Sequence, residues 1–253
     1  MNKITLLAMT LTLTYTAQAQ LQPKKMTPES SEQWSPVPRL VAPGSPSTSV
    51  SGFTAPEDAI VLFDGSNLDA WESASGGGPA PWTVAGGAMT VVPRKGDIQT
   101  KQTFGDFQLH IEWRTPAEVK GDGQGRGNSG IFMQGIYELQ VLDSYNNRTY
   151  SNGQAGSIYK QTMPLVNASK GPGEWQTYDV VYTAPRFNKD GQMLIPPYIT
   201  VIHNGVLIQN HTQIQGTTPY VGQPGIQPHG RGPIKLQDHG NPTSFRNVWI
   251  REL

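Results

Sequence analysis

Acidic and amide side chains alternate with apolar ones in the stretch YELQVLDSYNN, residues 137–147. Successive side chains of a β-strand point to opposite faces, so Glu138 and Gln140 would share one face. Asp143 follows one residue too late, and would join them only if a β-bulge adds a residue after Gln140. Two carboxyl groups on one face can act as general base and general acid. The stretch therefore brings two carboxyl groups to one face if the bulge is present, and leaves an isolated Glu138 if it is absent.

Each candidate also has a purely structural interpretation. Glu138 could form a cross-strand ion pair with Arg114, a contact worth about 0.2–1 kcal/mol. Asp143 is followed by serine and two asparagines and could be a turn-forming aspartate at a strand end. Asn128 precedes Ser-Gly, and His239 precedes Gly-Asn-Pro, so turn formation alone could explain both. These alternatives stay open at the level of sequence.

The elements that must position these residues are strands. Asn204-Gly205 lies between two alternating apolar runs, which is a strong signal for a β-hairpin. No stretch keeps an apolar period of 3.6 residues over three turns. We therefore expect an all-β protein, a sandwich or jelly roll of two antiparallel sheets, with Trp71, Trp82 and Trp175 in the core. The runs that resemble strands are 82–93, 107–115, 129–135, 137–143, 174–185, 198–210, 232–240 and 244–253.

Polar residues of several kinds occupy the outward positions of these runs. His110, Glu112 and Arg114 lie opposite the apolar positions of one run, and Gln237 lies opposite those of another. A mixture of acid, amide, imidazole and guanidinium is typical of a polar groove. A plain solvated sheet face remains the alternative, because any half-exposed sheet alternates.

The 253 residues carry 19 Lys and Arg and 19 Asp and Glu, and they include no cysteine. Balanced charge gives no indication of nucleic acid or an anionic membrane as a partner. The lack of cysteine excludes disulfides, thiolate metal sites, a cysteine nucleophile and a lipid-modified N-terminal cysteine.

The N-terminus has the layout of a secretory signal. Lys3 precedes an apolar stretch, and Ala17-Gln18-Ala19 fits a cleavage site. The apolar stretch is too short for a membrane span. We therefore expect a signal peptide over 1–19, a Pro/Ser-rich linker or extended segment over 20–55, and one domain over 56–253, secreted or periplasmic.

No cofactor is evident from the residues. The five histidines show no H-x-H or H-E-x-x-H spacing. A divalent metal held by Glu112, Glu138, Asp143 and His239 from different strands is conceivable but has no signature in the sequence.

The sequence resembles the 3-keto-disaccharide hydrolase family in five blocks taken together. These blocks are FDGSNLDAW, FGDFQLHIEWRT, GNSGIFMQGIYELQVLDS, GEWQTYDVVYTAP and GPIKLQDHGNPTSFRNVWIREL. The resemblance spans about residues 57–253 in the same block order. It implies an exported bacterial protein with a concanavalin A-like jelly roll, a carbohydrate groove on the concave sheet, and a small sugar oxidised at C3 as substrate.

A ketone at C3 implies a particular reaction. A base removes the acidified C2 proton, and the enolate expels the group at C1. Addition of water to the enone completes a net hydrolysis, whereas stopping at the enone would make the enzyme a lyase. We expect Glu138 and Asp143 as base and acid, so that Glu138→Gln and Asp143→Asn would each abolish turnover, with Arg114 or Lys160 stabilising the enolate. The other candidates for binding the sugar are Glu112, Asn128, Gln140, Gln237 and His239.

Two other functions remain as alternatives. Glucanases with this architecture carry E-x-D-x-x-E or E-x-D-x-E on one strand, whereas this chain has Gln140 in place of the middle Asp and Asp143 in place of the last Glu. A retaining glycosidase needs two carboxyl groups about 5–5.5 Å apart, so these departures disfavour a conventional glucanase. A non-catalytic carbohydrate-binding module is the second alternative, because a fold alone does not give a function.

Overall fold

The computed structural model describes residues 25–40 and 55–253. The 3-10 helices in these ranges are η1 (Pro28–Ser31), η2 (Gly123–Gly125) and η3 (Ser151–Gly153). The strands are β1 (Arg39–Leu40), β2 (Ile60–Phe63), β3 (Trp71–Ser73), β4 (Thr83–Ala85), β5 (Ala88–Thr90), β6 (Ile98–Thr100), β7 (Phe107–Arg114), β8 (Ser129–Met133), β9 (Tyr137–Val141), β10 (Val166–Asn167), β11 (Gln176–Thr183), β12 (Arg186–Phe187), β13 (Met193–Ile195), β14 (Tyr198–His203), β15 (Val206–Gln213), β16 (Lys235–Leu236) and β17 (Ser244–Glu252).

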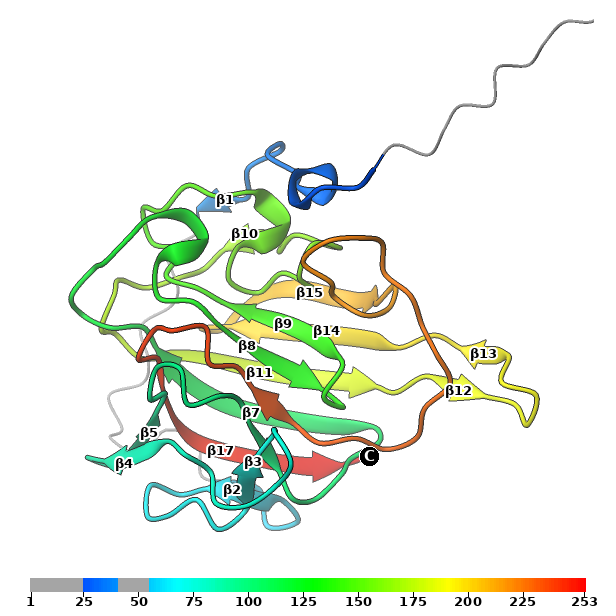
Figure 1. The fold of residues 1–253 in the computed structure, drawn as a ribbon, viewed down its shortest axis with the longest axis horizontal. Coiled ribbons are helices and arrows are strands. Elements are labelled where there is room, and N and C mark those ends of the chain that lie inside the picture. Colours follow the sequence, from blue (N-terminus) through cyan, green and yellow to red (C-terminus); the bar gives the residue numbers. More distant parts are fainter. Residues whose placement is uncertain (1–24, 41–54) are drawn as a thin grey trace, which may run out of the picture.

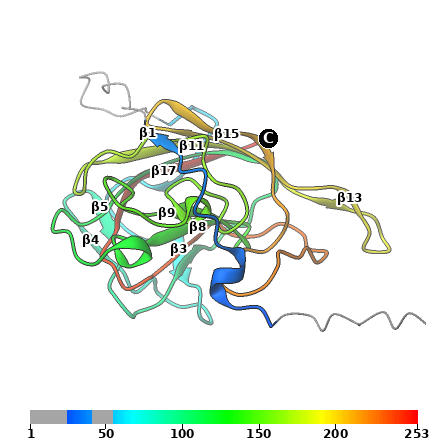
Figure 2. The same cartoon turned by 90° about the horizontal axis from the view of Figure 1, so that it is seen from above.

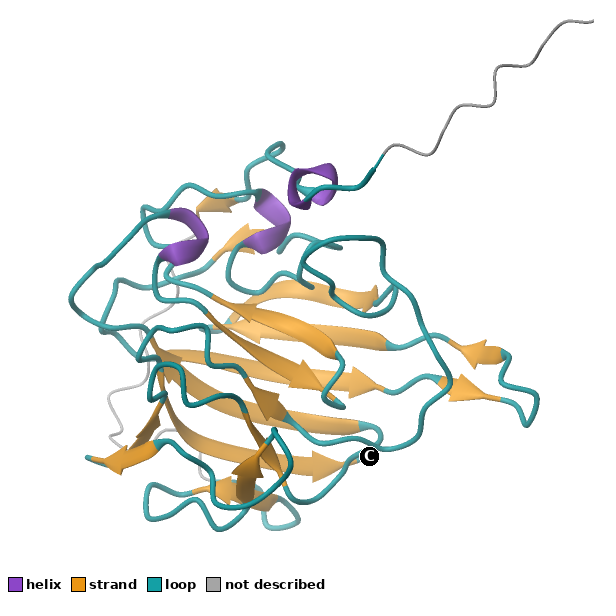
Figure 3. Ribbon diagram, viewed as in Figure 1, coloured by secondary structure: helices purple, strands orange, loops and turns teal. Residues whose placement is uncertain are grey.

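Two antiparallel sheets form the body of the molecule. The eight-stranded sheet has the order β15-β14-β11-β7-β17-β5-β4, with β2 also paired to β17, and the five-stranded sheet has the order β3-β6-β16-β8-β9. Figure 1 shows the five-stranded sheet in front of the larger one, and Figure 2 shows the two layers from above. Strands and loops make up nearly all of the chain drawn in Figure 3, so the predicted all-β sandwich is confirmed.

The core lies between the sheets because apolar residues alternate along the strands of both. Leu109, Ile111 and Trp113 of β7 are fully buried, as are Leu139 and Val141 of β9. Burying one such aliphatic side chain is worth about 1.5–3 kcal/mol. The alternation therefore determines which face of each strand points inward, and it sends the polar residues of β7 and β9 to the two opposite outer faces of the sandwich.

The predicted hairpin is present. His203 pairs with Val206, and the two residues between them, Asn204 and Gly205, have φ values of 51° and 82°. Positive φ at both central residues is what a two-residue hairpin turn of type I′ requires. The run 82–93, in contrast, is a second hairpin of β4 and β5 and not a single strand.

The segment 25–40 runs outside the two sheets and contains η1 and β1. β1 pairs in parallel with β10. In Figures 1 and 2 this blue segment lies beside the loops near β9 and β15. It belongs to the region in which a linker or extended segment was expected.

The predicted signal peptide lies outside the described residues, as does part of the expected linker. Within 25–40 and 55–253, no helix combines the length and the apolar character needed to cross a membrane.

Candidate functional site

A pocket lies on the outer face of the five-stranded sheet. β8 and β9 pair without a register shift, which sets Glu138 opposite Phe132 and Gln140 opposite Gly130. Lys235 of β16 lies on the other side of Phe132. Because Gly130 has no side chain, the sheet surface is hollow there, and the Glu138 carboxyl group lies over it. The pocket has a volume of about 210 Å³, below the roughly 300–1,000 Å³ of pockets for drug-sized ligands, and so suits one sugar ring.

Glu138 is the chemically unusual group of this pocket. Its side chain is almost fully buried, and no hydrogen bond or ion pair reaches its carboxyl group from the residues that the structure describes. Burial disfavours a charged carboxylate and raises the pKa of Glu138 to about 8; the positive charge of Lys235 opposes this shift, and the negative charge of Asp97 adds to it. A carboxyl group with such a pKa can accept and return a proton near neutral pH.

Three residues that line the pocket each have a buried side-chain amide oxygen without a hydrogen-bond partner among the described residues: Asn128 Oδ1, Gln140 Oε1 and Gln237 Oε1. Two of the amides have a fixed orientation, because Asn128 Nδ2 donates to Gln124 O at 2.7 Å and Gln140 Nε2 donates to Gly153 O at 3.3 Å. Buried polar atoms nearly always have a partner in folded proteins. These acceptors therefore fit the hydroxyl groups of a bound molecule.

Aromatic and hydroxyl side chains complete the pocket. Tyr220 lines the pocket and is 62% exposed, so a ligand can reach this residue. Tyr159 lies deeper, and its hydroxyl group is 2.7 Å from that of Tyr150. An aromatic rim over hydrogen-bonding groups is typical of sites that bind small polar molecules. The full lining consists of Asn128, Phe132, Glu138, Gln140, Tyr159, Thr218, Tyr220, Gln237 and His239.

Asp143 belongs to a different pocket. β9 ends at Val141, and the consecutive residues Val141 and Leu142 both lie in the core, so strict alternation stops before Asp143. Two consecutive inward residues shift the alternation by one, as a bulge does, so Asp143 returns to the outer side although the paired part of β9 is regular. The shift that the sequence required is therefore present just after β9, but Asp143 lines a neighbouring pocket and does not share that of Glu138.

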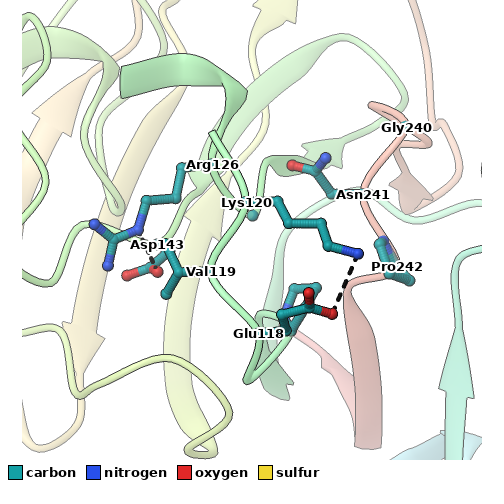
Figure 4. Close-up of a pocket in the computed structure, with 10 residues that line it drawn as sticks. Glu118, Val119, Lys120, Arg126, Asp143, Gly240, Asn241 and Pro242 are labelled. Atoms are coloured by element: carbon teal, nitrogen blue, oxygen red, sulfur yellow. Dashed lines mark hydrogen bonds and ion pairs between the residues drawn. The ribbon is translucent and has the colours of Figure 1, made fainter. Parts of the chain in front are cut away.

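Figure 4 shows the pocket that Asp143 lines, which has a volume of about 310 Å³. Asp143 accepts a hydrogen bond from Arg126 Nε at 2.7 Å, and this pair lies across the pocket from Asn241 and Pro242. Asp143 Oδ1 also accepts from the backbone N–H of Tyr145 at 3.2 Å. The second contact is a local turn of the kind that aspartate favours, so the geometry supports the turn-forming interpretation of Asp143.

The two sheets also separate Arg114 and Glu112 from Glu138. Both residues are on the outer face of β7, in the eight-stranded sheet, with the core between them and the pocket. The expected single groove and the Glu138–Arg114 ion pair are therefore wrong, because β7 and β9 are in different sheets. The Arg114 guanidinium lies 4.6 Å from the ring centroid of Trp175. Trp175, expected in the core, is half-buried on this outer face.

Glu112 is part of a network of charges on that face. Its carboxylate accepts from Arg246 Nε at 2.6 Å and from Asn247 Nδ2 at 2.9 Å. Burial would raise the pKa of Glu112, but bonds from His110, Asn247 and Arg246 lower it to about 2. Burial would lower the pKa of His110, but its 2.7 Å hydrogen bond to Asp179 and the nearby Glu112 raise it to about 9. This network holds a protonated histidine between two carboxylates.

Lys160 lies near the pocket but does not line it. Its ammonium group donates to Pro28 O at 2.7 Å and to Tyr220 O at 2.8 Å, and its side chain is buried. The expected direct contact of Lys160 with the sugar is replaced by contacts with the protein backbone. Of the predicted site residues, the structure brings Glu138, Gln140, Asn128, Gln237 and His239 together.

The conceivable metal site does not assemble. Glu112 is on the other sheet and Asp143 lines the other pocket, so only Glu138 and His239 of the four residues share a site. In the described part of the chain, no three His, Asp or Glu side chains gather in a way that could hold an ion.

The sequence reasoning missed four residues of the pocket. Phe132 stands at an outward strand position, where an aromatic residue could have been suspected of facing a groove. Tyr159, Thr218 and Tyr220 come from irregular loops, and no periodicity relates them to β9. Only the tertiary structure reveals them.

Comparisons with known proteins identify the family of this chain. Residues 58–251 match the family model described as a 3-keto-alpha-glucoside-1,2-lyase-like domain. The 3-keto-disaccharide hydrolase of Bacteroides thetaiotaomicron is 25% identical over 235 residues, covering 77% of this chain and 78% of that protein.

Solved structures from Parabacteroides distasonis ATCC 8503 have the same fold. One, described as a candidate glycosyl hydrolase, is 60% identical with a TM-score of 0.79, covering 90% of this chain and 97% of that one. A second is 22% identical with a TM-score of 0.56, covering 78% and 94% of the two chains. The chain belongs to the 3-keto-disaccharide hydrolase family, a family of glycoside hydrolases.

Proposed function

We propose that the protein cleaves the glycosidic bond of 3-keto glycosides by removing the C2 proton and eliminating the group at C1. One observation carries the proposal: an unpaired, buried carboxyl group, Glu138, shares a small pocket with three amide oxygens that lack partners. The family and the relative named a 3-keto-disaccharide hydrolase support sugars oxidised at C3 as the substrate class.

Binding places the oxidised ring over the sheet. Sugar hydroxyl groups donate to the free oxygens of Asn128, Gln140 and Gln237, which leaves C2 facing the Glu138 carboxyl group. Hydrogen-bond acceptors that lack partners in the free protein reward a ligand that supplies donors. A substrate without hydroxyl groups at these points would leave the acceptors unsatisfied.

Glu138 acts as the base in the first step. The ketone acidifies the C2 proton, the ionised carboxylate removes it, and the electron pair passes into the C2–C3–O enolate. The raised pKa makes this carboxylate a stronger base than an exposed glutamate. The positive charge of Lys235 and the His239 side chain in the pocket wall favour the negative charge that develops on the enolate oxygen.

The same residue acts as the acid in the second step. The enolate collapses, a C1–C2 double bond forms and the C1–O bond breaks. The proton that Glu138 removed passes to the leaving oxygen, so one carboxyl group serves both steps. The product is a 3-keto sugar with a 1,2 double bond; addition of water across that bond completes a net hydrolysis.

A conventional glycosidase mechanism has weaker support. It requires a second carboxyl group about 5–5.5 Å away for retention or about 6.5–9.5 Å away for inversion. Glu138 is the one carboxyl group that lines this pocket in the described ranges, and Asp143 is paired with Arg126 in the other pocket.

The test follows the C2 proton. The full chain is incubated in D₂O with methyl 3-keto-α-glucoside and a 3-keto disaccharide of two glucose units, and with their native forms. NMR follows the C2–H signal and the released alcohol or sugar. We expect release and loss of the C2–H signal from the oxidised sugars only, and neither with Glu138→Gln.

Glu72→Gln is the matched control, because Glu72 is on an outer strand of the same sheet and bonds to Gln99 at 2.9 Å. The Glu72→Gln variant should release the product and lose the C2–H signal as the wild type does. Products from the native glucosides would identify a conventional glycosidase, and binding without exchange or release would identify a carbohydrate-binding module. Either result overturns the proposal.

A further inference from the structure

The N-terminal segment 25–40 lies outside the family match, which begins at residue 58, yet it packs against the loops around the pocket. Asn152 Nδ2 donates to Ser31 O at 3.1 Å, and the backbone N–H of Gln33 donates to Asn152 Oδ1 at 3.2 Å. Ser151 Oγ donates to Pro36 O at 2.7 Å. The segment is thus held mainly through its own backbone, and two routes lead from it to the pocket.

The first route passes through Lys160. One ammonium group bonds to Pro28 O, in the segment, and to Tyr220 O, in the loop that forms the pocket rim. It also lies 4.6 Å from the ring centroid of Tyr220 and 5.5 Å from that of Tyr150. Burial lowers the pKa of Lys160, and the carboxylates of Glu32 and Glu29, both in the segment, oppose that shift. The segment therefore supplies a carbonyl acceptor and two negative charges for a buried cation.

The second route passes through three aromatic rings. Trp34, half exposed in the segment, meets the Tyr150 ring edge-on with centroids 6.3 Å apart. Tyr150 is buried, and its hydroxyl group bonds to that of Tyr159, which lines the pocket beside Glu138. This route reaches the floor of the pocket, whereas the Lys160 route reaches its rim.

We propose that the segment 25–40 is a working part of the sugar-binding site: through Lys160 and the Tyr150–Tyr159 pair it holds Tyr220 and Tyr159 against the bound sugar. Tyr220 then offers a fixed ring face for stacking on the substrate. Lys160 and Tyr150 are positioning residues, and the chemistry stays with Glu138. The identity of the ligand rests on the proposed function.

Pre-organisation is the physical reason to expect an effect on affinity. If Tyr220 and its loop are already held before binding, the sugar does not have to order them. Loss of the contacts through Lys160 or the Tyr150–Tyr159 pair should therefore weaken sugar binding and leave the proton transfer at Glu138 unchanged. A merely structural role of Lys160 would not raise KM while leaving kcat unchanged.

Two measurements on the full chain test the inference. The first is amide hydrogen exchange of the peptide 216–223 in the wild type, Lys160→Met, Trp34→Ala and the control Lys170→Met. Lys170 also donates to a backbone carbonyl, Trp175 O at 3.1 Å, but that residue lies away from the pocket. We expect exchange in 216–223 to rise about tenfold in Lys160→Met and to stay at the wild-type rate in Lys170→Met.

The second measurement is turnover of the 3-keto disaccharide. We expect KM to rise about five- to tenfold in Lys160→Met and about threefold in Trp34→Ala, with kcat within about twofold of wild type. Trp34→Ala alters an exposed side chain, so it decides the matter if Lys160→Met does not fold. Unchanged KM in both variants, or a fall in kcat as large as the rise in KM, would overturn the inference.

Failure of the proposed function looks different. In that case the wild type turns over no 3-keto glycoside, whatever the variants do. The exchange measurement alone then decides whether the segment holds the Tyr220 loop. An unchanged exchange rate in Lys160→Met would show that it does not.

Discussion

The carboxyl group of Glu138 occupies the space that a side chain at Gly130 would need. A Cβ atom built on Gly130 would lie 2.5 Å from Oε1 of Glu138 and 2.9 Å from the nearest ring carbon of Phe132. Gly130 is in β8 with ordinary strand backbone, so space, and not backbone conformation, explains the glycine. The hollow that it leaves is what lets Glu138 lie flat on the sheet inside the pocket.

Gly130→Ala should therefore displace the Glu138 carboxyl group and the Phe132 ring. We expect kcat/KM on a 3-keto glycoside to fall about 100-fold or more, since misplacing a catalytic group by about 1 Å costs on that order. Thermal unfolding should change little, because the atoms that must move are the ends of side chains. Gly105→Ala is the control: its Cβ would meet only Arg231 at 3.6 Å, so activity should be retained. Full activity in Gly130→Ala would mean that the position of Glu138 is unimportant.

The rate should increase with pH through the titration of Glu138. The base must be ionised to remove the C2 proton, and burial raises its pKa to about 8. The pH profile of kcat/KM reports the pKa values of the free enzyme. We therefore expect a rising limb with a midpoint near pH 8, measured from initial rates between pH 5.5 and 9.5. A flat profile across this range would assign the base to another group.

Glu138 should also lower stability at alkaline pH. Its pKa is about 8 in the folded chain and near 4.5 when unfolded, so the folded state binds the proton more tightly. The free energy of unfolding contributed by this group therefore falls as pH rises from about 4.5 to about 8. Glu138→Gln, which cannot ionise, should be more stable than wild type by on the order of 5 kcal/mol at pH 9, and about equal to it at pH 4.5. Denaturant unfolding at the two pH values measures the free energy of unfolding of both proteins. The same difference between variant and wild type at both pH values would contradict the prediction.

His110, in the charge network of the other sheet, should also lower stability as pH rises, over a higher pH range. Its pKa is about 9 when folded, against 6.5 for the free side chain, so protonation stabilises the fold. The contribution is complete below pH 6.5 and is lost as pH rises through about 9. His110→Gln should cost about 2 kcal/mol at pH 6 and much less at pH 10. Turnover by the folded variant should stay normal, because the core separates His110 from the pocket; a large loss of kcat would contradict that placement.

Asp143→Asn should reduce stability more than chemistry. The substitution leaves the half-buried Arg126 guanidinium without its carboxylate, although an amide oxygen can still accept one hydrogen bond. Removing one partner of a buried ion pair costs about 3–5 kcal/mol, and partial exposure of Arg126 and the remaining acceptor reduce this to about 1–3 kcal/mol. The folded variant should keep exchange at C2 of the sugar within about threefold of wild type. Complete loss of exchange in a folded Asp143→Asn chain would restore Asp143 as a catalytic residue.

The sequence alone determined the inward and outward faces of the long strands and the position of one hairpin. Alternation along 107–115 and 137–143 gave the faces of β7 and β9 correctly, because the period of two is a property of the extended backbone. Asn204-Gly205 gave a hairpin, because those residues tolerate positive φ. Alternation also turned Glu138, Gln140 and Gln237 outward, whereas Asn128 became a site candidate only through the family resemblance; all four line one pocket.

Only the tertiary structure decided which strands share an outer face of the sandwich. Both β7 and β9 turn a polar face away from the core, and alternation cannot say whether two such faces belong to one sheet or to opposite sheets. Strand pairing over long separations placed Arg114 and Glu112 on one side of the sandwich and Glu138 on the other. It also brought Tyr159, Tyr220 and the segment 25–40 to the pocket through contacts between residues far apart in the chain, which no local pattern encodes.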